Sequence, residues 1–130
     1  MTDLSAIHEG ETPVEHDGEF VAIKSYYALM NQAGVAAPVA TVLQNSVGAI
    51  VWTYLANGEY VCTLAGAFLV GKYFCAGSIF REPLNGDTIG IYCTRIDDDS
   101  VMISGQNITQ AQSLQDDALV NAPLEIRIFP

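Results

Sequence analysis

Basic residues are scarce in this chain, and where they occur they stand alone. The 130 residues include five Lys and Arg against fifteen Asp and Glu, which gives a formal net charge of −10. Nucleic-acid binding needs a cationic face that displaces counterions from phosphates, and anionic membranes attract clusters of Lys and Arg. We therefore expect neither a nucleic acid nor a membrane among the partners. The basic residues are Lys24, Lys72, Arg81, Arg95 and Arg127.

Metal-binding residues are also few. His8 and His16 both lie near the start of the chain, and the three cysteines show neither CxxC nor Cys/His spacing, so no zinc site is expected. The cysteines are odd in number, and each lies in an apolar strand-like run. This is typical of buried thiols in a protein assembled in a reducing compartment. They are Cys62, Cys75 and Cys93.

Residues arranged for catalysis are lacking as well. A nucleophile needs a rigidly held base beside it, and both histidines lie in a segment expected to be partly mobile. No glycine pattern matches a phosphate-binding or dinucleotide-binding loop. A small hydrolase would need two carboxylates across a cleft, but a surface turn or an outward strand position explains each candidate. These candidates are Glu59, Glu82, Asp87 and Glu125. We expect no enzymatic activity and no cofactor.

One acidic cluster leaves two interpretations open. Asp97-Asp98-Asp99 is either a solvated turn or part of a site for a hard cation such as calcium, which Asp116-Asp117 would have to complete. The segment lacks the alternating ligands and the bidentate Glu of a helix-loop-helix calcium site. We expect the turn and no bound metal.

Long membrane-spanning runs are absent, although the chain is half apolar and only 15% charged. The longest uncharged run, Ser25 to Gly58, contains Pro38, Gln44 and Asn45, so it is not a membrane helix. The first residues turn acidic instead of basic and then apolar, and we expect no secretory leader. This composition predicts one folded domain with a sizeable core.

The first nineteen residues differ in composition from the rest. They are acidic and contain Gly10, Pro13 and Gly18, which disfavour a helix. Two interpretations are open: a solvated leader, or an irregular arm that becomes ordered when it docks on a partner. We divide the chain into an acidic N-terminal arm, residues 1–19, and a single β-domain, residues 20–130.

The remaining pattern predicts an all-β fold. About eight short apolar runs are separated by turn signals, with no convincing long amphipathic helix. This is typical of an antiparallel β-sandwich or a jelly-roll-like barrel. The stretch from Gly105 to Ala122 is predicted to be irregular. The expected strands are 20–31, 39–44, 51–56, 59–64, 73–76 with an extension over 78–81 past a kink at Gly77, 88–96, 101–104 and 124–129.

The clearest local signal is Asn57-Gly58, a dipeptide that favours a tight hairpin turn. If Ala56 faces Glu59, regular pairing places Leu55 opposite Tyr60 and Trp52 opposite Thr63. Both faces of such a hairpin are apolar. We therefore expect its own second sheet to cover one face and a partner to cover the other. The candidate interface residues are Trp52, Tyr54, Val61, Thr63, Tyr60 and Leu55.

An alternative function concerns aromatic side chains, which can form a platform for sugars. A carbohydrate-binding module recognising host surface glycans would present several of them on one exposed face. More often such residues pack in a core or a subunit interface. The candidates for the platform are Trp52, Tyr54, Tyr60, Tyr73 and Tyr92.

Several segments resemble a family of small uncharacterised β-rich proteins encoded near virion structural genes of tailed bacteriophages. The resemblance extends from about Ser25 to the C-terminus and contains no catalytic signature. It rests on Ala37-Pro38-Val39-Ala40-Thr41-Val42-Leu43-Gln44-Asn45, Val51-Trp52, Gly58-Glu59-Tyr60, Thr63-Leu64-Ala65-Gly66-Ala67-Phe68 and Pro123-Leu124-Glu125-Ile126-Arg127-Ile128.

This resemblance implies a non-enzymatic structural role in a virion. Capsid decoration proteins, head-fibre proteins and tail-associated proteins all fit that description. It also implies assembly in the cytoplasm of a bacterial host, docking to other virion proteins, and self-association as a homo-oligomer, commonly a trimer.

Overall fold

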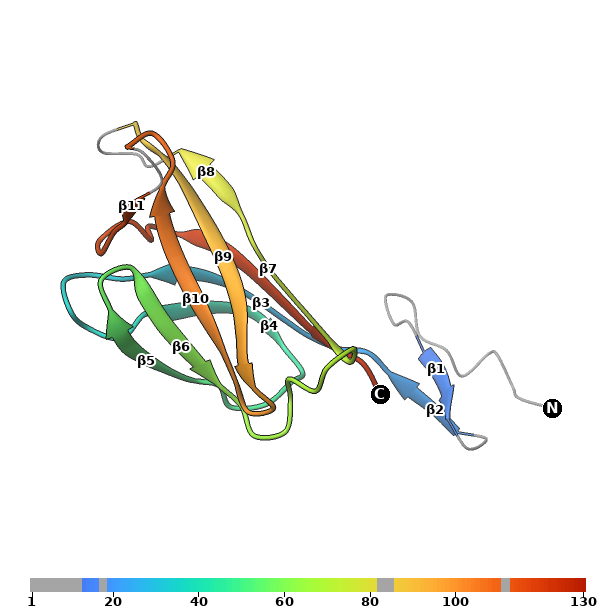
Figure 1. Ribbon diagram of the computed structural model, residues 1–130. Coiled ribbons are helices and arrows are strands. Elements are labelled where there is room, and N and C mark those ends of the chain that lie inside the picture. The colour runs from blue at the N-terminus through green and yellow to red at the C-terminus, as the bar shows by residue number, and fades with distance from the viewer. Residues whose placement is uncertain (1–12, 17–18, 82–85, 111–112) are drawn as a thin grey trace.

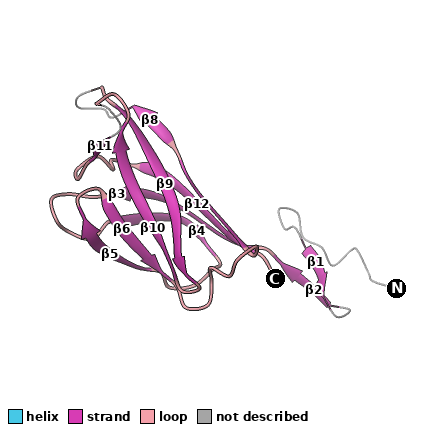
Figure 2. Ribbon diagram, in the orientation of Figure 1, coloured by secondary structure: helices cyan, strands magenta, loops and turns pink. Residues whose placement is uncertain are grey.

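The computed structural model describes residues 13–16, 19–81, 86–110 and 113–130, with side chains from Ala22 onward. Within these residues the secondary structure consists of strands without a helix (Figure 2). Two antiparallel sheets pack against each other without closing into a barrel (Figure 1). The predicted all-β antiparallel sandwich is thus confirmed, with ten strands in the two sheets of the described part instead of about eight.

The smaller sheet has four strands in the order β4-β3-β12-β7 within the described residues. Alternate residues of β3 are buried, as expected for a strand with one face on the core. The same alternation occurs in β12, where the predicted inward positions Leu124 and Ile126 are buried and Ile128 is half-buried. The strand bounds are β3 Lys24–Asn31, β4 Val39–Asn45, β7 Tyr73–Gly77 and β12 Ala122–Ile128.

The larger sheet has the order β5-β6-β10-β9-β8 in the described part, and the two-residue β11 pairs with β10. Strand β10 extends to Asn107, further than the Ser104 predicted, because it pairs with β9 along its whole length. The stretch expected to be irregular therefore begins within a strand. The bounds are β5 Val51–Ala56, β6 Glu59–Thr63, β8 Ile79–Arg81, β9 Thr88–Asp97, β10 Ser100–Asn107 and β11 Ser113–Leu114.

The start of the chain forms a separate strand pair. Strand β1, Pro13–His16, pairs antiparallel with β2, Glu19–Ala22, outside the two sheets (Figure 1). The strand predicted within residues 20–31, through Lys24 to Met30, is confirmed as β3, but residues 20–22 belong to β2 instead. The chain divides at Ile23, because β2 pairs with β1 whereas β3 pairs with β4 and β12. Residues 1–12, 17 and 18 of the predicted arm lie outside the described residues.

The Asn57-Gly58 turn joins β5 to β6 as predicted. Gly58 has a φ of 70°, and a Cβ on it would lie 2.4 Å from the backbone nitrogen of Gln115, so glycine is required there. The predicted register is wrong beyond the first pair. Ala56 faces Glu59 as expected, but Tyr54 faces Tyr60, which leaves Leu55 as an extra residue in a β-bulge.

Because of this bulge, the residues of β5 before Leu55 face β6 residues one position earlier than regular pairing would give. Tyr54 and Tyr60 now point to the same side, into the sandwich, and so do Trp52 and Cys62, which pair directly. The opposite side carries Val51, Thr53, Leu55, Val61 and Thr63.

One side of the sandwich is closed by a strand that changes sheets. Strand β7 pairs with β12 in the small sheet, and after Gly77 and Ser78 the chain continues as β8, paired with β9 of the large sheet. The kink predicted at Gly77 is confirmed. A Cβ on Gly77 would lie 2.2 Å from Cγ2 of Ile91 and 2.7 Å from its carbonyl oxygen. The two sheets can meet here only because residue 77 has no side chain.

Replacing Gly77 with alanine should separate the sheets at this crossing. We expect Gly77→Ala to lower the free energy of unfolding by about 2–3 kcal/mol, because the added methyl group overlaps a fixed backbone. Urea denaturation measures the difference. The matched control is Gly105→Ala in β10, where the new Cβ meets no atom closer than 3.4 Å. Equal losses of stability in the two variants would contradict the role of the crossing.

Candidate functional site

The six predicted interface residues divide between the two sides of the hairpin. The inner residues pack in or against the core, and Tyr60 is 0% exposed, so it faces no partner. The outer residues remain accessible, and Leu55 is 54% exposed. The inner residues are Trp52, Tyr54 and Tyr60. The outer residues are Leu55, Val61 and Thr63.

The five aromatic residues proposed as a sugar platform do not share an exposed face. Trp52, Tyr54 and Tyr60 point inward, and Tyr73 packs edge-on against Phe68 with ring centroids 5.5 Å apart. Tyr92 lies on the outer side of β9. No observation among the described residues favours the carbohydrate-binding alternative, which stays a prediction.

The Asp97-Asp98-Asp99 carboxylates form hydrogen bonds and an ion pair with neighbouring residues of the protein. Asp97 accepts hydrogen bonds from the Ser100 hydroxyl and the Asp99 amide, and these bonds lower its pKa. Asp98 pairs with Arg95, and Asp99 accepts from the Gly66 amide. This arrangement is typical of a turn stabilised by its own side chains. In the described part no group of three or more potential ligands gathers around a metal position.

The carboxylates considered for hydrolysis do not converge either. Glu59 and Glu125 lie on the outer faces of opposite sheets, and Asp87 accepts hydrogen bonds from Asn107 and Gln110. Glu82 lies outside the described residues. The three described candidates, Glu59, Asp87 and Glu125, therefore do not face one another as a pair.

A polar cluster that the sequence did not reveal lies at one end of the sandwich, around Asp116. The Asp116 carboxylate accepts hydrogen bonds from the Tyr54 hydroxyl at 2.7 Å, the Tyr60 hydroxyl at 3.0 Å and the Gly58 amide at 2.7 Å. Asn57 accepts a hydrogen bond from the Asp116 amide. These bonds attach the segment after β11 to the β5–β6 hairpin.

Gln32 extends this cluster toward the small sheet. Its side-chain oxygen lies 2.8 Å from the Tyr60 hydroxyl and shares the single hydrogen of that hydroxyl with Asp116, and it also accepts from the Asp117 amide at 2.9 Å. Its amide group donates to the carbonyl oxygens of Gly34 and Ala36. Asp116 and Asp117 are thus structural, and they lie at the opposite end of β6 from Asp97-Asp98-Asp99. The only signal for this cluster in the sequence is an acidic pair directly before Ala118 and Leu119, which are buried.

The electrostatics of the cluster follow from these contacts. Burial by itself raises the pKa of Asp116, but the hydrogen bonds from Gly58, Tyr54 and Tyr60 outweigh it and hold the pKa below its ordinary value. Burial raises the pKa of Tyr60, and the neighbouring carboxylate raises it further. The cluster therefore keeps a charged carboxylate between two neutral phenols at neutral pH.

The side of the sandwich opposite Gly77 is open, and its two edge strands carry no charged residue. In the described structure β4 and β5 each pair with one strand only. They contribute seven and six residues. Both belong to the uncharged run from Ser25 to Gly58. Their exposed apolar side chains include Val39 at 66%, Leu43 at 65%, Val51 at 57% and Leu55 at 54%.

A groove of about 470 Å³ runs between these two edges. Val39 and Val42 line it from β4, and Ile50 and Trp52 line it from β5 and the preceding loop. Val42 is 48% exposed although it lies opposite the buried Ala28, because no further strand covers the edge. We call β4, β5 and this groove the open edge.

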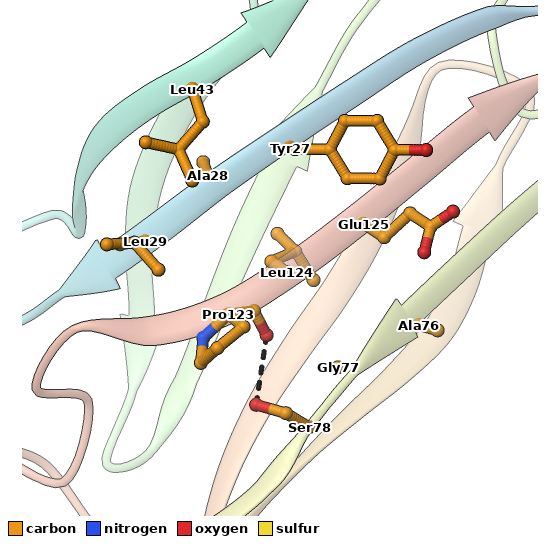
Figure 3. A pocket seen from close by; sticks show the side chains of 10 residues that line it. All are labelled: Tyr27, Ala28, Leu29, Leu43, Ala76, Gly77, Ser78, Pro123, Leu124 and Glu125. Carbon is orange, nitrogen blue, oxygen red and sulfur yellow. Dashed lines mark hydrogen bonds between the residues drawn. The ribbon is translucent and has the colours of Figure 1, made fainter. Parts of the chain in front are cut away.

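The outer face of the small sheet holds a second groove, of about 290 Å³. Figure 3 shows Leu29, Leu43 and Pro123 along it, with Tyr27 and Glu125 at one end. Arg127 forms an ion pair with Glu125 and donates to the Tyr27 hydroxyl at 3.2 Å. A mostly apolar groove with one internally paired charge is suited to contact with another protein surface.

Comparisons with known proteins give no assignment. No family model, no curated protein and no solved structure matches the chain. In the part of the chain that the structure describes, no helix is long and apolar enough to cross a membrane.

The Asp116 cluster predicts a specific dependence of stability on pH. Because its pKa is lowered on folding, Asp116 stabilises the fold above about pH 4 and loses this contribution as the pH falls through its folded pKa. We expect Asp116→Asn to cost about 1–2 kcal/mol at pH 7 and less at pH 3. Urea denaturation across this range provides the measurement.

The control for this prediction is Glu59→Gln, which removes a half-buried carboxylate of β6 that accepts no side-chain hydrogen bond among the described residues. It should change stability little at either pH. A loss in Asp116→Asn that is equal at pH 7 and pH 3 would show that the charge of Asp116 does not stabilise the fold.

Proposed function

We propose that this chain is a non-enzymatic structural component of a bacteriophage virion, which self-associates through the open edge and docks on other virion proteins. The observation that carries the proposal is the absence of charge from both strands of the open edge. The resemblance to proteins encoded near phage virion genes supports the biological setting. Capsid decoration, a head fibre and a tail-associated position are all compatible with it.

Proteins protect the edges of their sheets against pairing with other chains. An edge strand presents unpaired amide and carbonyl groups, and natural monomers usually block it with charged residues, Pro, a β-bulge, short length or a covering segment. Strands β4 and β5 have neither charge nor proline along their length, and each has one bulge, at Leu43 and at Leu55. A second copy of the chain can pair with these strands and cover the groove between them.

The alternation within β5 supports the same surface. Trp52 and Tyr54 point into the sandwich, whereas Val51, Thr53 and Leu55 point outward. An outer row of threonine and aliphatic side chains buries well against another strand or sheet. Association through the open edge therefore combines backbone pairing with apolar burial.

The second groove provides a surface on another face of the sandwich for a different partner. It lies on the outer face of the small sheet, centred on β3 and β12, and shares Leu43 of β4 with the open edge (Figure 3). Surfaces on two faces are what a virion component needs if it contacts copies of itself and another virion protein. Assembly in a bacterial cytoplasm and trimeric symmetry remain part of the proposal, supported by the resemblance and, for assembly, by the free cysteines.

A single charge in the middle of β5 should prevent self-association. We expect the full chain to be a homo-oligomer at micromolar concentration and Thr53→Lys to be a monomer, because a lysine on an edge strand blocks pairing. Light scattering coupled to size-exclusion chromatography measures the mass.

The matched control is Thr94→Lys. Thr94 is an exposed threonine of the same sheet, but it lies in β9, where it pairs with Met102 of β10, away from the free edge of β5. This variant should keep the oligomer mass. A monomeric wild-type chain, or a Thr53→Lys variant with unchanged mass, would contradict the proposal.

A further inference from the structure

Two cysteines from different sheets meet at the closed side of the sandwich. Cys75 lies in β7 of the small sheet and Cys93 in β9 of the large sheet. Their sulfur atoms are 2.8 Å apart. Non-bonded carbon atoms lie roughly 3.5–4.0 Å apart, and sulfur is larger than carbon. The two sulfur atoms are therefore closer than an ordinary van der Waals contact.

The Gly77 crossing explains why these sulfurs meet. Gly77 lies against Ile91, and the Ile91 amide donates to the Ser78 carbonyl oxygen at 2.9 Å. Cys75 is two residues before Gly77, and Cys93 is two residues after Ile91. Because side chains alternate along strands, each cysteine is the next inward-facing residue beyond the crossing. The backbone therefore fixes the two thiols opposite each other.

We propose that Cys75 and Cys93 form a redox site, in which a small disulfide such as oxidised glutathione converts the two thiols into a disulfide bond between the sheets. One cysteine thiolate attacks a glutathione sulfur, forms a mixed disulfide and releases one glutathione thiolate. The second cysteine then attacks the protein sulfur of that mixed disulfide and releases the other glutathione. Two electrons pass from the protein thiols to the glutathione disulfide, and the two thiol protons complete two glutathione thiols.

The surroundings of the pair suit this reaction. Both cysteines are half-buried, whereas Cys62 is 0% exposed and is not a competing partner. The hydrogen bond from the Cys75 thiol and another from the Gly77 amide lower the pKa of Cys93 against the effect of burial. Burial raises the pKa of Cys62 to about 12, so it stays a thiol. Cys93 is thus favoured as the first attacking group.

The redox pair is independent of a role in a virion. It is compatible with free thiols in a reducing compartment, because the two cysteines stay reduced there and form the disulfide in an oxidising medium. The disulfide bond would close a chain loop between two cysteines that are 18 positions apart. Because a closed loop restricts the unfolded chain, the bond should raise the midpoint of thermal unfolding by about 10 °C.

The experiment compares the full chain after incubation with oxidised glutathione and after incubation with dithiothreitol. The oxidised sample should have one free thiol instead of three, a mass lower by two hydrogens, and a Cys75–Cys93 crosslinked peptide after digestion. Its midpoint of thermal unfolding should rise by about 10 °C. Three free thiols with an unchanged midpoint, or a bond involving Cys62, would overturn the proposal.

Variants separate the bridge from a general effect of cysteine replacement. Cys62→Ser should still close the bridge and show the same rise on oxidation. Cys75→Ala and Cys93→Ala should show no rise, and each is compared with its own reduced sample, so a lower starting stability does not affect the result. A rise in either alanine variant equal to that of the wild type would contradict the assignment.

Discussion

The close approach of Gly77 to Ile91 is the constraint on which the rest of this structure depends. It allows one chain segment to serve both sheets, β7 in the small sheet and β8 in the large one. The sandwich is thereby closed on one side and open on the other, where β4 and β5 have free edges (Figure 1). On the closed side, this approach places Cys75 opposite Cys93. The open side is the surface proposed for self-association.

The polar end of the sandwich shows how buried hydroxyl groups determine strand register. Tyr54 and Tyr60 point inward and need acceptors, which Asp116 and Gln32 supply. An unpaired buried hydroxyl costs about 1–3 kcal/mol, which disfavours a register that separates these tyrosines from their acceptors. The bulge at Leu55 brings both tyrosines to the same acceptor. The register of the hairpin therefore depends on a residue about sixty positions later in the chain.

The sequence predicted those features that depend on local chemistry. The alternation of apolar residues, the Asn57-Gly58 turn and the kink at Gly77 are all properties of neighbouring residues, and the corresponding strands and turns are present. The division at Ile23 and the bulge at Leu55 were not predictable, because each depends on a partner distant in sequence. The Asp116 cluster was missed for the same reason, since Asp116-Asp117 resembles an ordinary solvated loop when Tyr54, Tyr60 and Gln32 are not known to lie beside it.

The uncharged run from Ser25 to Gly58 can be interpreted more fully once the strand order is known. The sequence alone shows that this run is not a membrane helix. The structure shows that it forms both strands of the open edge and most of β3. The uncharged segment is thus partly placed at the surface. The proposed self-association requires uncharged apolar residues of this kind at the surface.

Hydrogen exchange of the backbone amides, measured in dilute and in concentrated solutions of the full chain, tests the account most directly. If the open edge pairs with a second copy, the β4 and β5 amides that point away from β3 and β6 should become protected as concentration rises. The amides through which β9 and β10 pair with each other within the subunit should not change. Equal exchange rates at the open edge at every concentration would contradict the account.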